Sequence, residues 1–212
     1  DEYTSQLNPQ YLTDVHSQDL FVTKLNSDGS YGWTQTYGSP QNVHGSKLAL
    51  DNAGNVYVLG NTADTFGSSN KSYTLHKFSS NGVADWSGVV GATRETIATD
   101  LAFSGDALYV TGTYQSSVDF DPTSGEDYHA FPGSYYDTNG FLTKVFTNGS
   151  YGWTNTFGGV TTVSAKGVAA NHLGDVFVAG YFKNTADFDP GLGDDLVTSA
   201  GGFDMFYAQF SS

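Results

Sequence analysis

Short runs of alternating apolar and polar residues follow one another along the chain, separated by clusters rich in Gly, Asn and Ser. In one stretch the alternation marks four successive runs, at 46–51, 55–62, 73–79 and 85–91. A period of two residues is typical of β-strands with one buried face. The same rhythm recurs between residues 97 and 158, and no segment has a convincing helical period. The pattern therefore predicts an all-β protein built of short strands.

Three Gly residues stand directly after Asp or Asn, shortly before a run that contains Trp. These dipeptides are Asp28-Gly29, Asn81-Gly82 and Asn148-Gly149. Gly adopts positive φ without steric cost, and Asn and Asp tolerate it better than most residues, so such pairs favour tight turns. Each dipeptide therefore predicts a hairpin between two adjacent antiparallel strands.

One larger pattern occurs three times along the chain. An aromatic residue is followed by Trp, and later by a strand that contains an aromatic residue and ends in Gly. The aligned residues are Phe21, Trp33, Tyr57 and Gly60; Tyr73, Trp86, Tyr109 and Gly112; Phe141, Trp153, Phe177 and Gly180; and a fourth copy opens at Phe206. Self-similarity at a nearly fixed period indicates a repeat architecture in which neighbouring units bury one another's apolar faces.

The stretches DLFVTKLNSDGSYGWTQTYG and LALDNAGNVYVLGNT closely resemble the SBBP-type β-propeller repeat of bacterial surface and secreted proteins. The resemblance covers nearly the whole chain. It implies an all-β fold of β-propeller type, with four-stranded antiparallel blades. It implies little about activity, because such repeats serve as scaffolds with few assigned functions.

Assigning the strands to blades gives a single repeat array over residues 1–212 with an incomplete ring. The expected units are a partial blade at 19–38, blades at 46–91 and 97–158, and a partial blade at 166–212. This is about three blades, whereas closed propellers have roughly four to eight. Three arrangements account for the difference: a piece of a longer array, a ring completed by further copies, or a head-to-tail filament. Each expects a partner for the terminal strands, namely further copies or further blades of the same array.

Composition narrows the classes of partner. The chain of 212 residues has 22 acidic and eight basic side chains, and its formal charge of −14 disfavours contact with nucleic acid. It has no Cys, which excludes disulfides and thiolate chemistry. No apolar run is long enough to predict a membrane span, and no signal peptide is recognised at Asp1. High acidity, low Lys and turn-rich repeats favour an extracellular or cell-surface protein.

Two similar acidic segments lie in long insertions between predicted strands. Asp119-Phe120-Asp121-Pro122 and Asp187-Phe188-Asp189-Pro190 each have a further acidic cluster a few residues on. Their closely spaced carboxylates could surround calcium, which prefers six to eight oxygen ligands. The candidate calcium ligands are Asp119, Asp121, Asp127, Asp187, Asp189 and Asp195. The alternative is a turn in which Asp side chains cap backbone amides while Phe120 and Phe188 fill a gap between blades.

Other candidate sites are weaker. The three Trp residues could stack on sugars, but their identical repeat position favours packing between blades. Glu95 and Asp100 could face a central channel as a glycosidase pair, although solvated loop charges are the simpler interpretation. The five His residues share no metal-binding spacing. The chain is therefore predicted to be a non-enzymatic extracellular scaffold for adhesion, surface or filament assembly, stabilised by calcium in one version. A lectin-like, glycan-binding propeller is the alternative, and a glycan-active enzyme ranks third.

Overall fold

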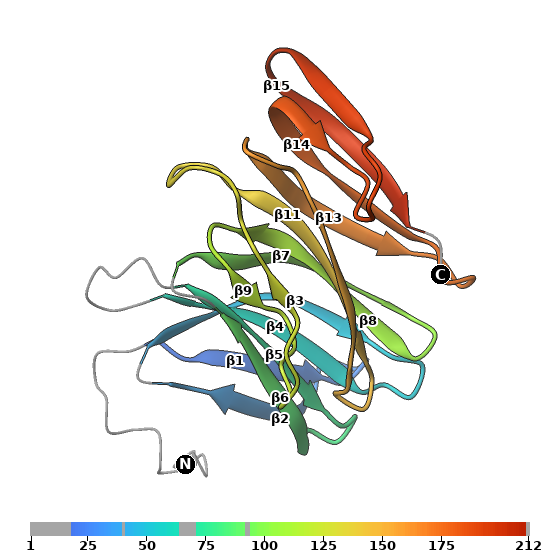
Figure 1. The fold of residues 1–212 in the computed structure, drawn as a ribbon. Helices are drawn as coiled ribbons and strands as arrows, with labels where there is room; N and C mark the ends of the chain where they lie inside the picture. The colour runs from blue at the N-terminus through green and yellow to red at the C-terminus, as the bar shows by residue number, and fades with distance from the viewer. Residues whose placement is uncertain (1–17, 40, 64–70, 92–93, 211–212) are drawn as a thin grey trace.

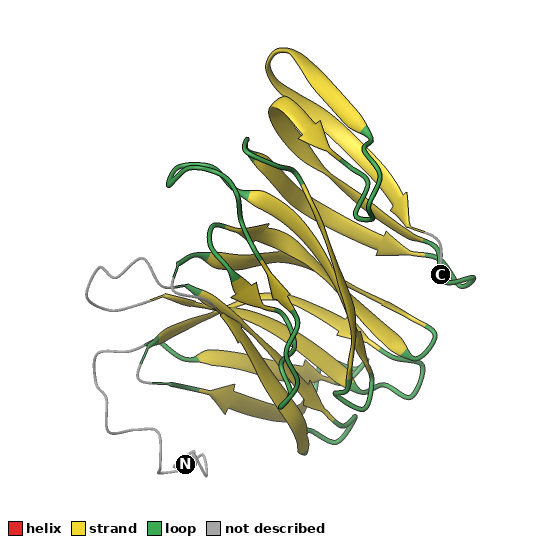
Figure 2. Ribbon diagram, in the orientation of Figure 1, coloured by secondary structure: helices red, strands yellow, loops and turns green. Residues whose placement is uncertain are grey.

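The protein is described by a computed structural model that covers residues 18–39, 41–63, 71–91 and 94–210. All regular structure within these residues is β-strand, and none is helix. The strands form several antiparallel sheets that succeed one another along the chain (Figures 1 and 2). The all-β fold predicted from the alternating pattern is confirmed. No helix that could cross a membrane occurs in the described part of the chain.

The first two sheets contain residues 20–91. Sheet I is a hairpin of β1 (Leu20–Leu25) and β2 (Tyr31–Tyr37). Sheet II has four strands in the order in which they occur along the chain: β3 (Asn42–Leu50), β4 (Val56–Ala63), β5 (Ser72–Phe78) and β6 (Ala84–Gly91). Each of these strands overlaps a run predicted from alternation.

The other two large sheets follow in the same manner. Sheet III is formed by β7 (Thr96–Ser104), β8 (Ala107–Tyr114), β11 (Asn139–Phe146) and β12 (Tyr151–Phe157). Between β8 and β11 a small ladder of β9 (Val118–Asp119) and β10 (Tyr128–His129) is inserted. Sheet IV is formed by β13 (Val163–Ala170), β14 (Val176–Asp187) and β15 (Leu196–Phe210).

The Gly hairpins have the predicted backbone. Gly29, Gly82 and Gly149 have φ values of 84°, 81° and 88°. The amide of each Gly donates to the carbonyl three residues earlier, and the strand register shifts beside each turn. A Gly of positive φ next to such a shift is the bulged form of a tight hairpin. Only the Gly adopts positive φ, so the preceding Asp or Asn contributes through its side chain: Asp28 Oδ1, for example, accepts the amide of Ser30 at 2.9 Å.

The sheets stack face to face, and the apolar core is divided among the gaps between them. One cluster joins Leu20 and Val22 of sheet I to Val43, Val56, Val58 and Phe78 of sheet II. A second joins sheets II and III and includes Tyr73 and Phe141, and a third joins sheets III and IV and includes Leu142 and Phe206. Each of the three clusters therefore lies between two sheets that are neighbours along the chain.

The register of the sheets corrects one position in the sequence alignment. Phe141 pairs with Gly112 and Phe206 pairs with Gly180, but Gly60 pairs with Thr74. Thr74, and not Tyr73, is thus the equivalent of Phe21, Phe141 and Phe206. Because side chains alternate between faces, Tyr73 lies on the opposite face and stacks on Phe141 of the next sheet at 5.6 Å between ring centroids. The sequence alignment places Tyr73 with Phe141 because both are aromatic, whereas strand pairing shifts the equivalent position by one residue, to Thr74.

Two strands are longer than the sequence indicated. Strands were expected near residues 175–181 and 205–210, whereas β14 continues to Asp187 and β15 begins at Leu196. The additional residues pair with each other, as in Thr185 with Thr198. The insertion expected between these strands is therefore largely an extended hairpin, whose ladder was hidden because its sequence does not alternate.

Candidate functional site

The first acidic segment is a closed loop that caps the β9–β10 ladder. Asp119 Oδ1 accepts the amide of Asp121 at 3.1 Å and the amide of Asp127 at 2.8 Å. The Phe120 amide donates to the Asp127 carbonyl at 3.0 Å. Inside the loop, Asp121 Oδ1 accepts both the amide and the hydroxyl of Thr123. In this pattern one Asp carboxylate accepts hydrogen bonds from the amides two and eight residues later in the chain. We call it the Asp clasp.

The second acidic segment contains the same Asp clasp. Asp187 Oδ1 accepts the amide of Asp189 at 3.0 Å and the amide of Asp195 at 2.9 Å. The Phe188 amide donates to the Asp195 carbonyl at 3.1 Å, and Asp189 Oδ1 accepts the amide of Gly191. The two loops, about seventy residues apart, thus form equivalent hydrogen bonds, which supports the turn interpretation of the repeated Asp-Phe-Asp-Pro sequence.

The predicted calcium ligands have other hydrogen-bond partners. Asp119 and Asp187 each use one oxygen to hold two amides, and Asp121 and Asp189 bind amides of their own loops. Within the described residues there is no group of three or more acidic or His side chains that could hold a metal ion. This arrangement does not fit a ready calcium site, which would need more converging oxygens. Calcium binding stays a prediction, and the corresponding first copy at 64–67 lies outside the described residues.

The two Phe residues of the acidic segments face the core. Phe120 is fully buried against Tyr114 and Phe141, with ring centroids 5.5 Å and 4.9 Å away. Phe188 is partly buried and packs on Phe182 and Phe206 at 5.3 Å and 4.7 Å. Each loop is therefore attached to its sheet by an aromatic side chain, as the packing interpretation predicted.

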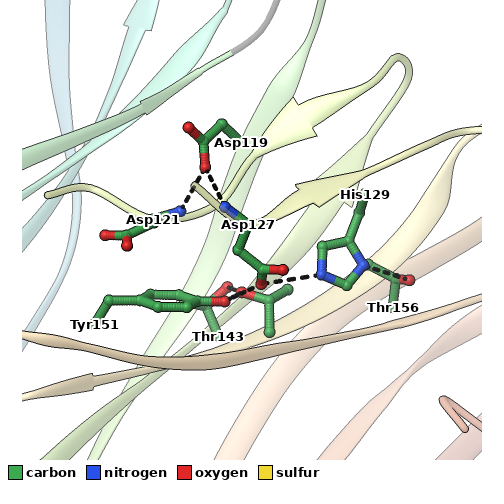
Figure 3. A network of polar contacts seen from close by, with 8 residues as sticks. Asp119, Asp121, Asp127, His129, Thr143, Tyr151 and Thr156 are labelled. Atoms are coloured by element: carbon green, nitrogen blue, oxygen red, sulfur yellow. Dashed lines mark hydrogen bonds and ion pairs between the residues drawn. The ribbon is translucent and has the colours of Figure 1, made fainter. Parts of the chain in front are cut away.

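A polar network joins the first loop to strand β12 (Figure 3). Asp127 Oδ2 lies 3.1 Å from His129 Nε2 and accepts a hydrogen bond from the Tyr151 hydroxyl. His129 Nδ1 lies 3.2 Å from Thr156 Oγ1, and the Tyr151 hydroxyl oxygen lies 2.9 Å from Thr154 Oγ1. Burial, together with the hydrogen bond to Asp127, raises the pKa of Tyr151 above its usual range. Tyr151 therefore remains a phenol that donates to the carboxylate.

This network has the order hydroxyl, imidazole, carboxylate that is also found in nucleophilic enzymes. An ionised Asp127 can only accept, so it fixes the proton on His129 Nε2 and leaves Nδ1 to accept the Thr156 hydroxyl. Acyl transfer would also need free donors for the anionic intermediate. Two amides that line the cavity beside Thr156 are occupied: Gly158 donates to the Asp187 carbonyl and Gly159 donates to Asn139 Oδ1.

The cavity beside Thr156 is small and acidic. It has a volume of about 220 Å³ and is lined by Thr156, Asn139, Asp187 and Asp189 among other residues. Ligand sites of drug-like size are usually larger, and two carboxylates oppose the build-up of negative charge on a bound ester or amide. The network is thus better suited to fixing the loop on the sheet than to catalysis.

Trp side chains join successive sheets in the same way at two places. Trp33 Nε1 of sheet I donates to the Ser80 carbonyl of sheet II at 3.1 Å, and its ring lies over Gly82. Trp86 Nε1 of sheet II donates to the Thr147 carbonyl of sheet III at 3.0 Å, over Gly149. We call this contact the Trp joint. It needs the Gly, because a Cβ at Gly82 would lie 2.6 Å from the indole. The packing role predicted for these Trp residues is confirmed.

The third Trp packs against the apolar cluster between sheets III and IV. Trp153 is partly buried, and its ring centroid lies 6.3 Å from that of Tyr109.

Glu95 and Asp100, the two candidate glycosidase carboxylates, each lie beside a Lys side chain. Glu95 forms an ion pair with Lys71. Asp100 lies 3.4 Å from Lys47 Nζ, and its other oxygen accepts the amide of Val168 in sheet IV. Both carboxylates thus have partners of their own, and Asp100 connects the first strands of sheets II, III and IV.

Two features were missed in the sequence. The contacts of Tyr151 and His129 depend on how the insertion folds back over β12, and residue spacing gives no sign of that. His76 of β5 is buried against the ring of Tyr37 at 3.9 Å, and its Nε2 has no hydrogen-bond partner. Burial lowers the pKa of His76 to about 4, so the imidazole is neutral at pH 7.

Comparison with known proteins adds no family to this description. No protein-family model matches the chain. No curated protein matches it either. Function must therefore be argued from the residues and the geometry.

Proposed function

We propose that the chain is a non-enzymatic, extracellular scaffold of β-propeller type, in which each four-stranded sheet acts as a blade. The observation that carries this proposal is the Trp joint, which recurs with the same atoms between sheets I and II and between sheets II and III. A joint repeated at two successive steps favours a rigid stack whose geometry does not depend on a ligand. The acidic loops are then the variable surface that the stack presents.

Two other observations support a scaffold over the lectin-like alternative. Trp33 and Trp86 use their indole N–H groups to bind main-chain carbonyls, so they are not free platforms for sugar stacking. A cavity of about 240 Å³ lies between Trp86, Tyr73 and Pro122, but it is bounded by Gly149 and the joint itself. Its size is below that of usual ligand sites.

Two features support an extracellular location: the high acidity of the chain and its resemblance to repeats of secreted bacterial proteins. A formal charge of −14 favours the solubility of a protein rich in exposed strands. The test is immunodetection of the chain in the medium or on intact cells of the organism that makes it. Recovery from the cell interior alone would contradict the location.

The scaffold function is tested with a glycan array and a panel of chromogenic glycosides, using the purified 212-residue chain. We expect no glycan binding in the micromolar range and no hydrolysis. The variant Trp86→Ala should lower stability without changing either readout. Glycan binding that Trp86→Ala abolishes, with the fold retained, would replace the scaffold with the lectin; turnover that His129→Gln abolishes would replace it with an enzyme.

A further inference from the structure

The two outermost sheets each have a face that no other part of the described chain covers. On sheet IV this C-face consists of large apolar side chains of β14 and β15: Phe177, Tyr181, Phe203, Met205 and Tyr207. Residues 203, 205 and 207 alternate along one strand, and Tyr181 pairs with Met205 across the ladder, so these side chains share one face. On sheet I the corresponding N-face consists of Phe21 and Leu25 of β1, with Thr23 and Thr34 between the strands.

The register of the sheets gives each exposed residue a buried counterpart. Phe21 pairs with Thr36, which lies three residues after Trp33. Phe141 pairs with Thr156, which lies three residues after Trp153. Met205 directly precedes Phe206, which pairs with Gly180. Tyr73 directly precedes Thr74, which pairs with Gly60. Phe21 is therefore equivalent to Phe141, and Met205 is equivalent to Tyr73.

The buried counterparts contact each other. Tyr73 of sheet II stacks on Phe141 of sheet III, and they are 2% and 0% exposed. Met205 and Phe21 occupy the same two positions on the outer faces and are 80% and 70% exposed. The two ends of the stack thus present the two halves of a contact that the chain already forms internally.

Neighbouring positions show the same relation. Tyr207 is largely exposed, whereas its equivalent Leu75 is buried between sheets II and III. Leu25 is exposed, whereas its equivalent Val145 is buried. At the first hairpin, a Cβ on Gly29 would meet no atom within 4 Å, whereas a Trp covers the equivalent Gly82.

We infer that the C-face of one copy of the chain packs on the N-face of a second copy, with Met205 on Phe21 in the arrangement of Tyr73 on Phe141. The inference rests on the proposed scaffold function and names its partner. The occupant is a second copy because all three internal interfaces join one face of a sheet to the opposite face of the next. Such a contact uses two different surfaces, so it is head-to-tail and extends until it closes a ring or forms a filament.

Charge determines the conditions under which this assembly should appear. A chain of charge −14 repels its own copies at long range, while the proposed contact is apolar. At 0.1 M salt, repulsion between charges more than about 10 Å apart is largely screened. The apolar contact does not depend on this screening. Association should therefore increase between low salt and 0.5 M salt, whereas association through ion pairs would decrease.

The test uses sedimentation velocity of the 212-residue chain over a range of concentrations. We expect the wild type to show species larger than a monomer that grow with concentration and salt. Met205→Glu and Phe21→Glu should each weaken association by about tenfold or more, because each places a carboxylate in the apolar contact. Leu173→Glu, a change at an exposed turn Leu outside both faces, is the matched control and should leave association unchanged.

Mixing the two variants separates this contact from other modes of assembly. The Phe21→Glu chain retains its C-face and the Met205→Glu chain retains its N-face, so a mixture should form heterodimers that cannot grow further. Glycan-array results do not bear on this outcome, so the scaffold and the head-to-tail contact can fail separately. A wild type that stays monomeric at all concentrations and salts would overturn the inference, as would association that only one of the two variants weakens.

A second measurement tests the same contact without the Glu variants, so that it does not depend on their folding. The chain has no Cys, so single Cys residues can be introduced without interference. Facing residues of packed sheets lie about 10 Å apart, too far for a disulfide, so a short bismaleimide is used to join the thiols. It should link Phe21→Cys to Met205→Cys as a heterodimer, whereas Leu173→Cys mixed with Met205→Cys should not be linked. Exclusive formation of Met205→Cys homodimers would show that the C-face binds itself, which contradicts the head-to-tail contact.

Discussion

The two acidic loops share one clasp but differ in how they are attached to the sheets. In both, one Asp holds the same two amides, and the following Phe amide closes the loop. The first loop is additionally tied to β12 through His129 and Tyr151, and its Phe120 is fully buried. The second is tied to the residue after β12 by a pair of main-chain hydrogen bonds between Gly158 and Asp187.

The difference separates local from tertiary determinants of a loop. The clasp depends on one Asp side chain and on amides of the same short segment, and it is present in both segments with the sequence Asp-Phe-Asp-Pro. The attachment depends on what the neighbouring sheet offers, and only the first loop has a Tyr and a Thr of β12 within reach. The first loop should therefore contribute more to the stability of its sheet than the second.

Truncation of the Phe residues should show the largest difference. Phe120→Ala removes a fully buried ring and should lower the free energy of unfolding by about 3 to 4 kcal/mol. Phe188→Ala removes a partly buried ring and should cost about 2 kcal/mol or less. Urea denaturation measures both, with Tyr136→Ala at an exposed position as the control. Equal costs for the two Phe variants would remove the distinction.

The network of the first loop should have a smaller effect. Tyr151→Phe removes the hydroxyl that donates to Asp127 and should cost about 1 kcal/mol. Tyr31 occupies the equivalent position in sheet I but is exposed, so Tyr31→Phe should change stability by less than about 0.5 kcal/mol. Thermal unfolding of the two variants checks the pair. A neutral Tyr151→Phe variant would show that burial alone attaches the loop.

The clasp itself should behave alike in the two loops. Asp119→Ala and Asp187→Ala each remove the acceptor of two amide hydrogen bonds and should each cost about 1 kcal/mol. Asp119→Asn and Asp187→Asn retain an oxygen that can accept these bonds and should cost about half as much or less. Urea midpoints of the four variants, measured without calcium, provide the comparison. Asn variants as unstable as the Ala variants would show that the negative charge matters beyond the clasp.

Removal of calcium should have the smallest effect. Because the carboxylates already hold amides, we expect chelation to shift the melting temperature by less than about 1 °C. Scanning calorimetry in excess chelator and in millimolar calcium chloride measures the shift. A larger stabilisation by calcium that Asp119→Asn or Asp187→Asn abolishes would establish the metal site that the sequence suggested.

Features that depend on short-range sequence were predicted well. The hairpins at Gly29, Gly82 and Gly149 were recognised because positive φ is a property of the residue itself. The strands of sheet II were placed within a few residues, because one buried face imposes alternation. The role of the Trp residues could be inferred since a repeated position implies a repeated contact.

Features that depend on pairing between distant segments were not predicted correctly. Tyr73 was aligned with Phe141 because both are aromatic, although cross-strand register places it on the opposite face. The ladder of Thr185 with Thr198 lies in a segment without alternation and was taken for a loop. The contact of His129 with Thr156 spans 27 residues and depends on the path of the insertion.

The Trp joint also sets an order in time for a chain that leaves the ribosome. Trp33 binds a carbonyl 47 residues later, and Trp86 binds one 61 residues later. At about 5 to 20 residues per second, each indole waits roughly 2 to 12 seconds for its partner to be synthesised. During that interval the newest sheet exposes the apolar face that the next one will cover. Folding should therefore advance from the N-terminus one sheet at a time, and slow synthesis should prolong the exposure of one sheet at most.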